Sequence, residues 1–297
     1  MAGRKLLTIV NPRGGLQQGA SVLDTVRPIL EAAEIALEVH KTERAGHATD
    51  IVKEAQLADF DGLCVIGGDG TAHEAVRGLM LQDSESRIPI GLIPAGTGNT
   101  LHHELGCETP TAAAEHIVAG KTRPIDVACV TTDQEEYYCI NIVGWGAVVD
   151  INITAERLRK LGRSRYALAA LWNVLWPRPR RATLTFDGRQ IEDEFLFIIG
   201  CNTRSTGSKM LLAPQAKIGD GLIDLVVLRN TSRRQMLNVF RKAFDGSHLS
   251  LPCIECHQVR SFSLTSDRPE LLNLDGELEG KSPLSVDVRS DAICVFG

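Results

Sequence analysis

Apolar and polar positions in the first third of the chain follow two alternating patterns. Short apolar runs, typical of strands, are separated by longer segments in which apolar residues recur every three or four positions, as on one face of a helix. The predicted strands span residues 5–10, 35–39, 63–66 and 88–93, and the predicted helices span residues 21–34, 45–57 and 101–105. This βα alternation predicts a parallel sheet covered by helices.

The pattern changes near residue 126, after which strand-like runs follow one another with few helices between them. The runs span residues 137–143, 182–186, 194–200, 222–228, 259–265 and 284–288, and helical spacing returns at residues 154–161, 166–175 and 232–244. This order is typical of an antiparallel β domain. We therefore predict an α/β protein with two domains. Residues 1–125 form a parallel α/β domain, residues 126–297 form a mainly antiparallel β domain, and a cleft between them is the expected ligand site.

Three of the predicted strands of the first domain run into glycine-rich loops, at residues 11–15, 67–71 and 94–100. The carboxyl ends of parallel strands meet at one edge of a sheet, so the loops should lie side by side. Glycine lets the backbone approach a ligand closely, and the N–H groups at a helix start favour phosphate. The alternative for residues 67–71 alone is a tight turn in which Asp69 caps the next helix.

Two common phosphate-binding motifs are excluded. Residues 276–282 have three residues rather than four between the glycines of a Walker A loop, and Pro283 forbids the helix that should follow. Residues 96–98 lack the third glycine of the dinucleotide fingerprint. Phosphate binding of another type is therefore expected.

Composition and charge argue against several classes of protein. The chain has 297 residues and a net charge of −5, which argues against nucleic acid as a partner. No apolar run approaches a membrane span, so we expect a cytoplasmic protein with eight reduced, unpaired cysteines. The segment 253–257 has the C-x-x-C-H pattern of haem attachment, but no signal peptide or second cysteine pair supports a haem or zinc site.

Several motifs of the chain, taken together, resemble those of a known superfamily. The three loops resemble the nucleotide-binding loops of the diacylglycerol kinase and sphingosine kinase superfamily. Further segments resemble its sphingoid-base kinase branch, at residues 42–48, 73–74, 156–162, 210–214, 220–225 and 275–277. The resemblance covers nearly the whole chain and implies an N-terminal domain of the NAD kinase/phosphofructokinase-like type.

The resemblance implies an ATP-dependent lipid kinase in which Mg²⁺ and basic side chains neutralise charge while a lipid hydroxyl attacks the γ-phosphate. Either Asp69 or Asp275 would take the hydroxyl proton, and Glu277 would orient nucleotide or metal. Asp220 matches a structural Mg²⁺ ligand of some relatives, although an Asp-Gly turn explains it equally well. The implied nucleotide-binding residues are Asn11, Gly14, Gly67, Gly68, Gly70, Thr71, Gly96, Thr97, Gly98, Asn99, Arg159 and Arg165.

Arg159 and Arg165 match phosphate-binding arginines of the family. Six residues apart, they cannot share one face of a continuous helix, but Gly162 ends the helix and can turn Arg165 back toward the same ligand. The alternative is a solvated basic surface.

The substrate is expected to be a lipid bound by the second domain. Leu168, Leu171, Trp172 and Leu175 recur at helical spacing, with Trp176 beside them. This stripe is either core or, as the resemblance implies, part of the acyl-chain pocket, where tryptophans with a basic flank suit peripheral membrane contact.

The head-group position departs from the branch. The acid that pairs with the sphingoid ammonium in sphingosine kinases falls on Asn152, and Asp150 is the nearest substitute. The first loop also has residues 16–19 in place of a Lys-Gly-Lys run. We expect a sphingoid long-chain base as substrate, with diacylglycerol as the alternative. NAD kinase activity and a non-catalytic lipid- or nucleotide-binding protein remain more distant alternatives.

Overall fold

The computed structural model describes residues 3–14, 18–96, 98–158, 165–206 and 210–297. The chain forms two compact units, Met1–Val127 with Ser290–Gly297, and Ala128–Arg289. The chain passes between the units twice, within two long strands. Each unit is described by itself.

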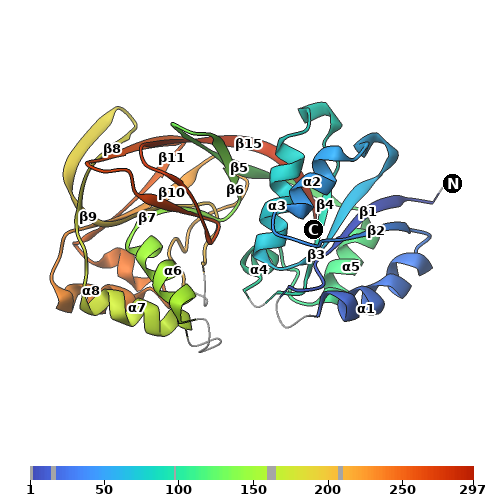
Figure 1. Cartoon of the computed structure of the whole chain (residues 1–297), viewed down its shortest axis with the longest axis horizontal. Helices are drawn as coiled ribbons and strands as arrows, with labels where there is room; N and C mark the ends of the chain where they lie inside the picture. Colours follow the sequence, from blue (N-terminus) through green and yellow to red (C-terminus); the bar gives the residue numbers. More distant parts are fainter. Residues whose placement is uncertain (1–2, 15–17, 97, 159–164, 207–209) are drawn as a thin grey trace. The chain divides into compact units, whose positions relative to one another are not determined.

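The first unit is a parallel sheet in the strand order β2-β1-β3-β4. Its strands are β1 (Lys5–Val10), β2 (Ala36–Lys41), β3 (Gly62–Gly67) and β4 (Ile90–Pro94), and its helices are α1 (Gly19–Ala32), α2 (His47–Glu54), α3 (Asp69–Met80), α4 (Thr100–Glu104) and α5 (Pro110–Ala119). Every residue of β3 and β4 is buried, which explains why these strands are continuous apolar runs in the sequence. Figure 1 shows the helices around this sheet.

The second unit is mainly antiparallel. Its strands are β5 (Thr122–Thr132), β6 (Glu136–Cys139), β7 (Ile142–Gly146), β8 (Arg180–Phe186), β9 (Arg189–Cys201), β10 (Ile223–Arg229), β11 (Ile254–Val259), β12 (Ser261–Ser266), β13 (Leu271–Leu274), β14 (Glu277–Lys281) and β15 (Leu284–Phe296), of which β5 begins and β15 ends in the first unit. Its helices are α6 (Ala147–Arg157), α7 (Arg165–Leu175) and α8 (Arg233–Lys242).

Strand β10 shows how the core of this unit is divided. Leu225 and Val227 point into a cluster formed by strands, whereas Val226 and Leu228 point into a second cluster that includes residues of α7 and α8. Because successive strand residues face opposite sides, β10 is buried on both faces. Figure 1 shows α6, α7 and α8 gathered on one side of these strands.

The predicted fold class is confirmed, with local differences. The predicted strand 137–143 is interrupted at Ile140 and Asn141, and α6 begins seven residues before the predicted helix 154–161. The predicted domains, 1–125 and 126–297, remain a proposal, and the structure differs from them at the C-terminus because Ser290–Gly297 belong to the first unit. There, Val295 of β15 pairs in parallel with Ile90 of β4. In the described part of the chain, we find no helix long and apolar enough to span a membrane.

Candidate active site

The three glycine loops follow adjacent parallel strands, as the βα pattern predicts. The N–H of Asn11 donates to the backbone oxygen of Ile66 at 3.0 Å, and the N–H of Ala95 donates to that of Gly67 at 2.8 Å. The first and third loops are therefore tied by backbone hydrogen bonds to the strand that carries the second. This brings the three loops to one edge of the first unit.

Gly68 and Gly96 are required by the close approach of the second and third loops. A Cβ at Gly96 would lie 2.5 Å from the Cα of Gly68, and a Cβ at Gly68 would lie 3.0 Å from the Cα of Gly96. Asn99, with φ of 54°, holds the third loop by accepting from the N–H of Gly96 at 3.1 Å and donating to its backbone oxygen at 3.0 Å. A side chain at either glycine would separate the loops.

Asn11 connects the first loop to the second. Its Nδ2 donates to Oγ1 of Thr71 at 2.9 Å, while its Oδ1 accepts from the N–H of Arg13 at 3.0 Å. Thr71 lies so close to Gly67 that a Cβ there would be 2.5 Å from the Thr71 Cβ. Gly14 packs against the Asn11 side chain, and Gly70 is the second residue of α3.

Asp69 reaches across to the third loop and the helix that follows it. It is the first residue of α3, and the N-cap position is Gly68, which provides no side-chain cap. The Oδ1 of Asp69 accepts from the N–H of Leu101 at 3.3 Å, and a Cβ at Gly98 would lie 2.7 Å from its Oδ2. The carboxylate therefore stands between two loops, where it can order them and also face a bound phosphate group.

His102 lies beside the third loop, on α4. No sequence motif marked it as a site residue. It is 1% exposed on α4, its ring is hydrogen-bonded to the backbone oxygen of Ile93, and its Nδ1 is buried without a partner among the described residues. Burial lowers the pKa of His102 from 6.5 to about 4, and His103 adds to this effect. The ring is therefore neutral at pH 7.

We expect His102 to make the protein less stable in acid. Between pH 6.5 and about 4, His102 binds a proton in the unfolded chain but not in the folded protein. The free energy of unfolding therefore falls as the pH falls, by about 3 kcal/mol in total. Urea unfolding at pH 7, 5.5 and 4.5 measures this loss. In His102→Leu the loss over the same range should be smaller, whereas parallel curves for both proteins would contradict the assignment.

Asp275 organises the connection between β6 and β7 in the second unit. Its carboxylate accepts three backbone N–H groups, from Ile140 at 2.9 Å, Asn141 at 2.8 Å and Ile142 at 2.9 Å. It sits 9% exposed in the turn between β13 and β14, with φ of 54°. These bonds interrupt the predicted strand 137–143, and they occupy lone pairs that a general base would need. Glu277 follows as the exposed first residue of β14.

The two expected head-group residues have partners within the second unit. Nδ2 of Asn152 donates to the backbone oxygen of Gly276 at 2.6 Å. The Asp150 carboxylate accepts from Arg180 at 2.8 and 2.9 Å, and Nε of Arg180 lies 2.5 Å from Glu270. Burial raises the pKa of Glu270, which Arg180 opposes. The sequence placed Arg180 in a basic flank and gave no sign of this ion pair.

The apolar stripe of α7 is exposed, so the interpretation of this stripe as core is wrong. Leu168, Leu171, Trp172, Leu175 and Trp176 are between 41% and 57% exposed. Trp172 and Trp176 stack with ring centroids 4.3 Å apart. The buried side of α7 is formed by small and polar residues with Val174, which leaves the larger apolar side chains facing solvent.

Several predicted site residues are placed differently or fall outside the described residues. Thr97 and Arg159 lie outside them, and of Arg165 only the backbone, the start of α7, is described. Asp220 accepts from the N–H of Leu222 at 3.1 Å, as in an Asp-Gly turn. No group of three or more His, Cys, Asp or Glu side chains arranged for a metal ion occurs among the residues that the structure describes, which include Asp220 and residues 253–257.

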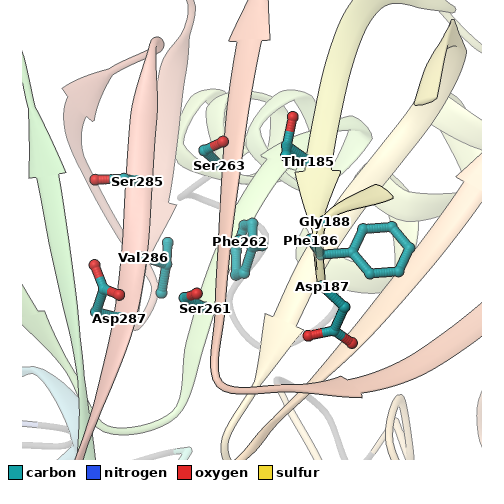
Figure 2. Close-up of a pocket in the computed structure, with 10 residues that line it drawn as sticks. All are labelled: Thr185, Phe186, Asp187, Gly188, Ser261, Phe262, Ser263, Ser285, Val286 and Asp287. Atoms are coloured by element: carbon teal, nitrogen blue, oxygen red, sulfur yellow. The ribbon is translucent and has the colours of Figure 1, made fainter. Parts of the chain in front are cut away.

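A pocket of about 220 Å³ lies in the second unit on β8, β12 and β15. Figure 2 shows hydroxyl side chains on its three strands and two aspartates at its rim. Thr185, Ser263 and Ser285 come together because they are direct partners in the strand register. The pocket contains none of the predicted site residues.

Comparison with known proteins gives two family models that together span most of the chain. The diacylglycerol kinase catalytic domain matches residues 5–130, and the YegS C-terminal NAD kinase beta sandwich-like domain matches residues 141–297. Sphingosine kinase 1 of Arabidopsis thaliana is 27% identical over 99% of this chain and 72% of its own length. Diacylglycerol kinase of Bacillus subtilis is 31% identical over 93% of this chain and 90% of its own length.

Solved structures agree with the fold. A diacylglycerol kinase from Bacillus anthracis superposes with a TM-score of 0.83 at 25% identity, over 100% of this chain and 98% of that chain. An NAD kinase from Archaeoglobus fulgidus, solved with ATP, superposes with a TM-score of 0.52 at 12% identity over 99% of this chain and 93% of that chain, and supports the fold alone.

Proposed function

The chain belongs to the diacylglycerol kinase and sphingosine kinase family and is a lipid kinase; on this premise we propose that it transfers the γ-phosphate of ATP to the free hydroxyl of diacylglycerol. A kinase of this family uses ATP, and its named relatives are kinases, so the alternative of a non-catalytic binding protein is set aside. Phosphoryl transfer depends mainly on positioning the two substrates and stabilising negative charge.

The first unit is proposed to bind the phosphates of ATP. Gly68 and Gly96 let the second and third loops approach each other closely, and Asn11, Thr71 and Asn99 fix the shape of the three loops. Backbone N–H groups in such loops, together with those at the start of α3, suit phosphate oxygens. We place Gly14, Gly67, Gly70, Thr97, Gly98, Arg159 and Arg165 in the same site on the strength of the motif.

Asp69 is the proposed general base. It is the acid of these loops, whereas Asp275 is already bound to three N–H groups and is proposed to position the turn that leads to Glu277. Mg²⁺ bound with ATP would neutralise phosphate charge. A structural Mg²⁺ at Asp220 stays a proposal that rests on the motif, and the Asp220 carboxylate itself accepts from the N–H of Leu222, as in an Asp-Gly turn.

The observation that favours diacylglycerol over a sphingoid base is the ion pair between Asp150 and Arg180. A sphingoid base carries an ammonium, which binds best to a carboxylate through a charge-assisted hydrogen bond. The acid of the sphingosine kinases is Asn152 here, and the Asp150 carboxylate is already bound by Arg180, which also pairs with Glu270. A neutral head group such as that of diacylglycerol needs no carboxylate. A sphingoid base, which the sequence motifs favour, is the second candidate because the match to Sphingosine kinase 1 of Arabidopsis thaliana spans 99% of the chain.

Asn152→Asp should shift the substrate preference toward a sphingoid base. A new carboxylate offers the ammonium a bond of roughly 1.5–3 kcal/mol, so the ratio of kcat/KM for sphingosine to kcat/KM for diacylglycerol should rise at least about tenfold. The ratio is used because a carboxylate cannot donate to Gly276, so the amount of folded protein is expected to fall, which affects both substrates equally.

Gln134→Glu is the matched control, since it adds the same charge at an exposed residue of the second unit and should leave the ratio unchanged. An unchanged ratio in Asn152→Asp would contradict the placement of the head group beside residue 152.

We further propose that the kinase works at the surface of the membrane that holds its lipid substrate. The exposed stripe of α7, which includes the proposed acyl-chain contacts Leu168, Leu171 and Trp172, supports this proposal. Tryptophan side chains favour the interface between lipid and water.

A further inference from the structure

Large exposed apolar side chains gather on two neighbouring helices of the second unit. Eight such side chains occur among the described residues, and one of them, Leu81, lies in the first unit. The other seven lie on α7 and α8 or just after them: Leu168, Leu171, Trp172, Leu175, Trp176, Leu237 and Phe244. We call the outward surface of residues 168–176 and 233–244 the α7–α8 face.

The two helices share one core beneath this face. Val174 of α7, Met236 and Val239 of α8, and Ala243 just after α8 belong to the same buried cluster, and the two helices contact each other. Figure 1 shows them side by side on one side of the strands. Because their buried residues pack into one layer, their exposed residues face away from that layer together.

Helix α8 adds positive charge to this apolar surface. It contains Arg233, Arg234, Arg241 and Lys242 and no acidic residue, in a chain whose net charge is −5. Arg234, Leu237, Arg241 and Phe244 are exposed and spaced by three or four residues, so basic and apolar side chains alternate along one outward stripe. Among the described residues, none of the three arginines forms an ion pair. The acid that follows, Asp245, accepts from the backbone and side chain of Ser247.

We propose that the α7–α8 face binds the surface of a bilayer that contains anionic phospholipid. The apolar side chains of α7 and α8 would enter the interface while the α8 arginines bind lipid phosphates, which is how basic amphipathic helices bind membranes. Arginine suits this role because its planar group binds phosphate oxygens in pairs. The charge of α8, and not the apolar stripe alone, then selects which bilayer is bound.

This inference rests on the proposed function in one respect: the phosphorylated product of a lipid kinase is itself anionic. Product formed in the bilayer adds negative charge to the surface that the α8 arginines contact. Binding is therefore expected to strengthen as product accumulates, and vesicles that contain phosphatidic acid test this without any turnover.

The test is co-sedimentation of the full chain with vesicles. We expect much stronger binding to phosphatidylcholine vesicles with about 30% phosphatidylglycerol or phosphatidic acid than to pure phosphatidylcholine, and weaker binding as salt rises. Each arginine at an anionic surface contributes about fivefold in affinity. The double variant Arg234→Gln/Arg241→Gln should therefore bind anionic vesicles about 25-fold more weakly, with its weak binding to neutral vesicles unchanged. Leu237→Gln and Trp176→Gln should weaken binding to both.

Arg189→Gln is the matched control, because it removes the charge of an exposed arginine at the start of β9, outside the α7–α8 face. The arginine variants should keep full turnover of diacylglycerol in detergent micelles, which separates membrane binding from the proposed function. Equal binding of neutral and anionic vesicles, or full binding by the double arginine variant, would overturn the proposal. A dimer in solution that Trp176→Gln dissociates would overturn it too, because a second copy would then cover the face.

Discussion

Replacing Asp69 with asparagine lowers kcat for lipid phosphorylation by at least about 100-fold, because the side chain can no longer accept the proton of the lipid hydroxyl. Asparagine keeps an Oδ1 that can accept from the N–H of Leu101, so the contact between the second and third loops survives. The change therefore tests proton transfer separately from loop order. The measurement is initial velocity with saturating ATP and lipid.

Asp69→Ala is the companion variant, since it removes both the proton acceptor and the contact to Leu101. If Asp69 is the base, both variants lose kcat to a similar extent, and only Asp69→Ala also raises the KM for ATP. Near wild-type turnover in Asp69→Asn, with loss in Asp69→Ala, would make Asp69 a residue that orders the loops.

Replacing Asp275 with alanine destabilises the second unit by about 3–5 kcal/mol, the scale expected when a buried charged acceptor is removed from its donors. Three N–H groups, at Ile140, Asn141 and Ile142, would lose their acceptor. Asp275→Asn should be milder, because its single oxygen can keep the bonds that Oδ1 now accepts from Asn141 and Ile142. Urea unfolding followed by circular dichroism measures both variants.

The matched control is Asp133→Ala, at an exposed aspartate of the same unit, which should change the unfolding free energy by less than about 0.5 kcal/mol. If Asp275→Ala unfolds like the wild type yet has no activity, the carboxylate acts on the substrate and its proposed positioning role is wrong.

The sequence was sufficient where one local pattern decides the structure. The continuous apolar runs of β3 and β4 predict buried parallel strands, and the position of a glycine loop after each strand predicts that the loops meet at one edge. The sequence does not show that Gly68 contacts Gly96. The many glycines in both loops indicate only that the backbone approaches something closely.

The sequence did not predict local structure or ion pairs that depend on residues far away in the chain. The break at Ile140 and Asn141 is caused by Asp275, more than 130 residues away, and Asp150 is paired with Arg180, 30 residues away. The residues before 154 are rich in β-branched side chains, which hides the first two turns of α6. The α7 stripe has the same spacing whether it faces core or solvent, so periodicity alone cannot decide its environment.

The most direct measurement is competition between two lipid substrates. The purified chain is supplied with ATP and Mg²⁺ and with equal amounts of diacylglycerol and sphingosine in mixed micelles, and the two phosphorylated products are separated and quantified. Because Asp150 is paired with Arg180 and residue 152 is an asparagine, phosphatidic acid should be the main product. Sphingosine 1-phosphate as the main product would contradict the account of the head-group site.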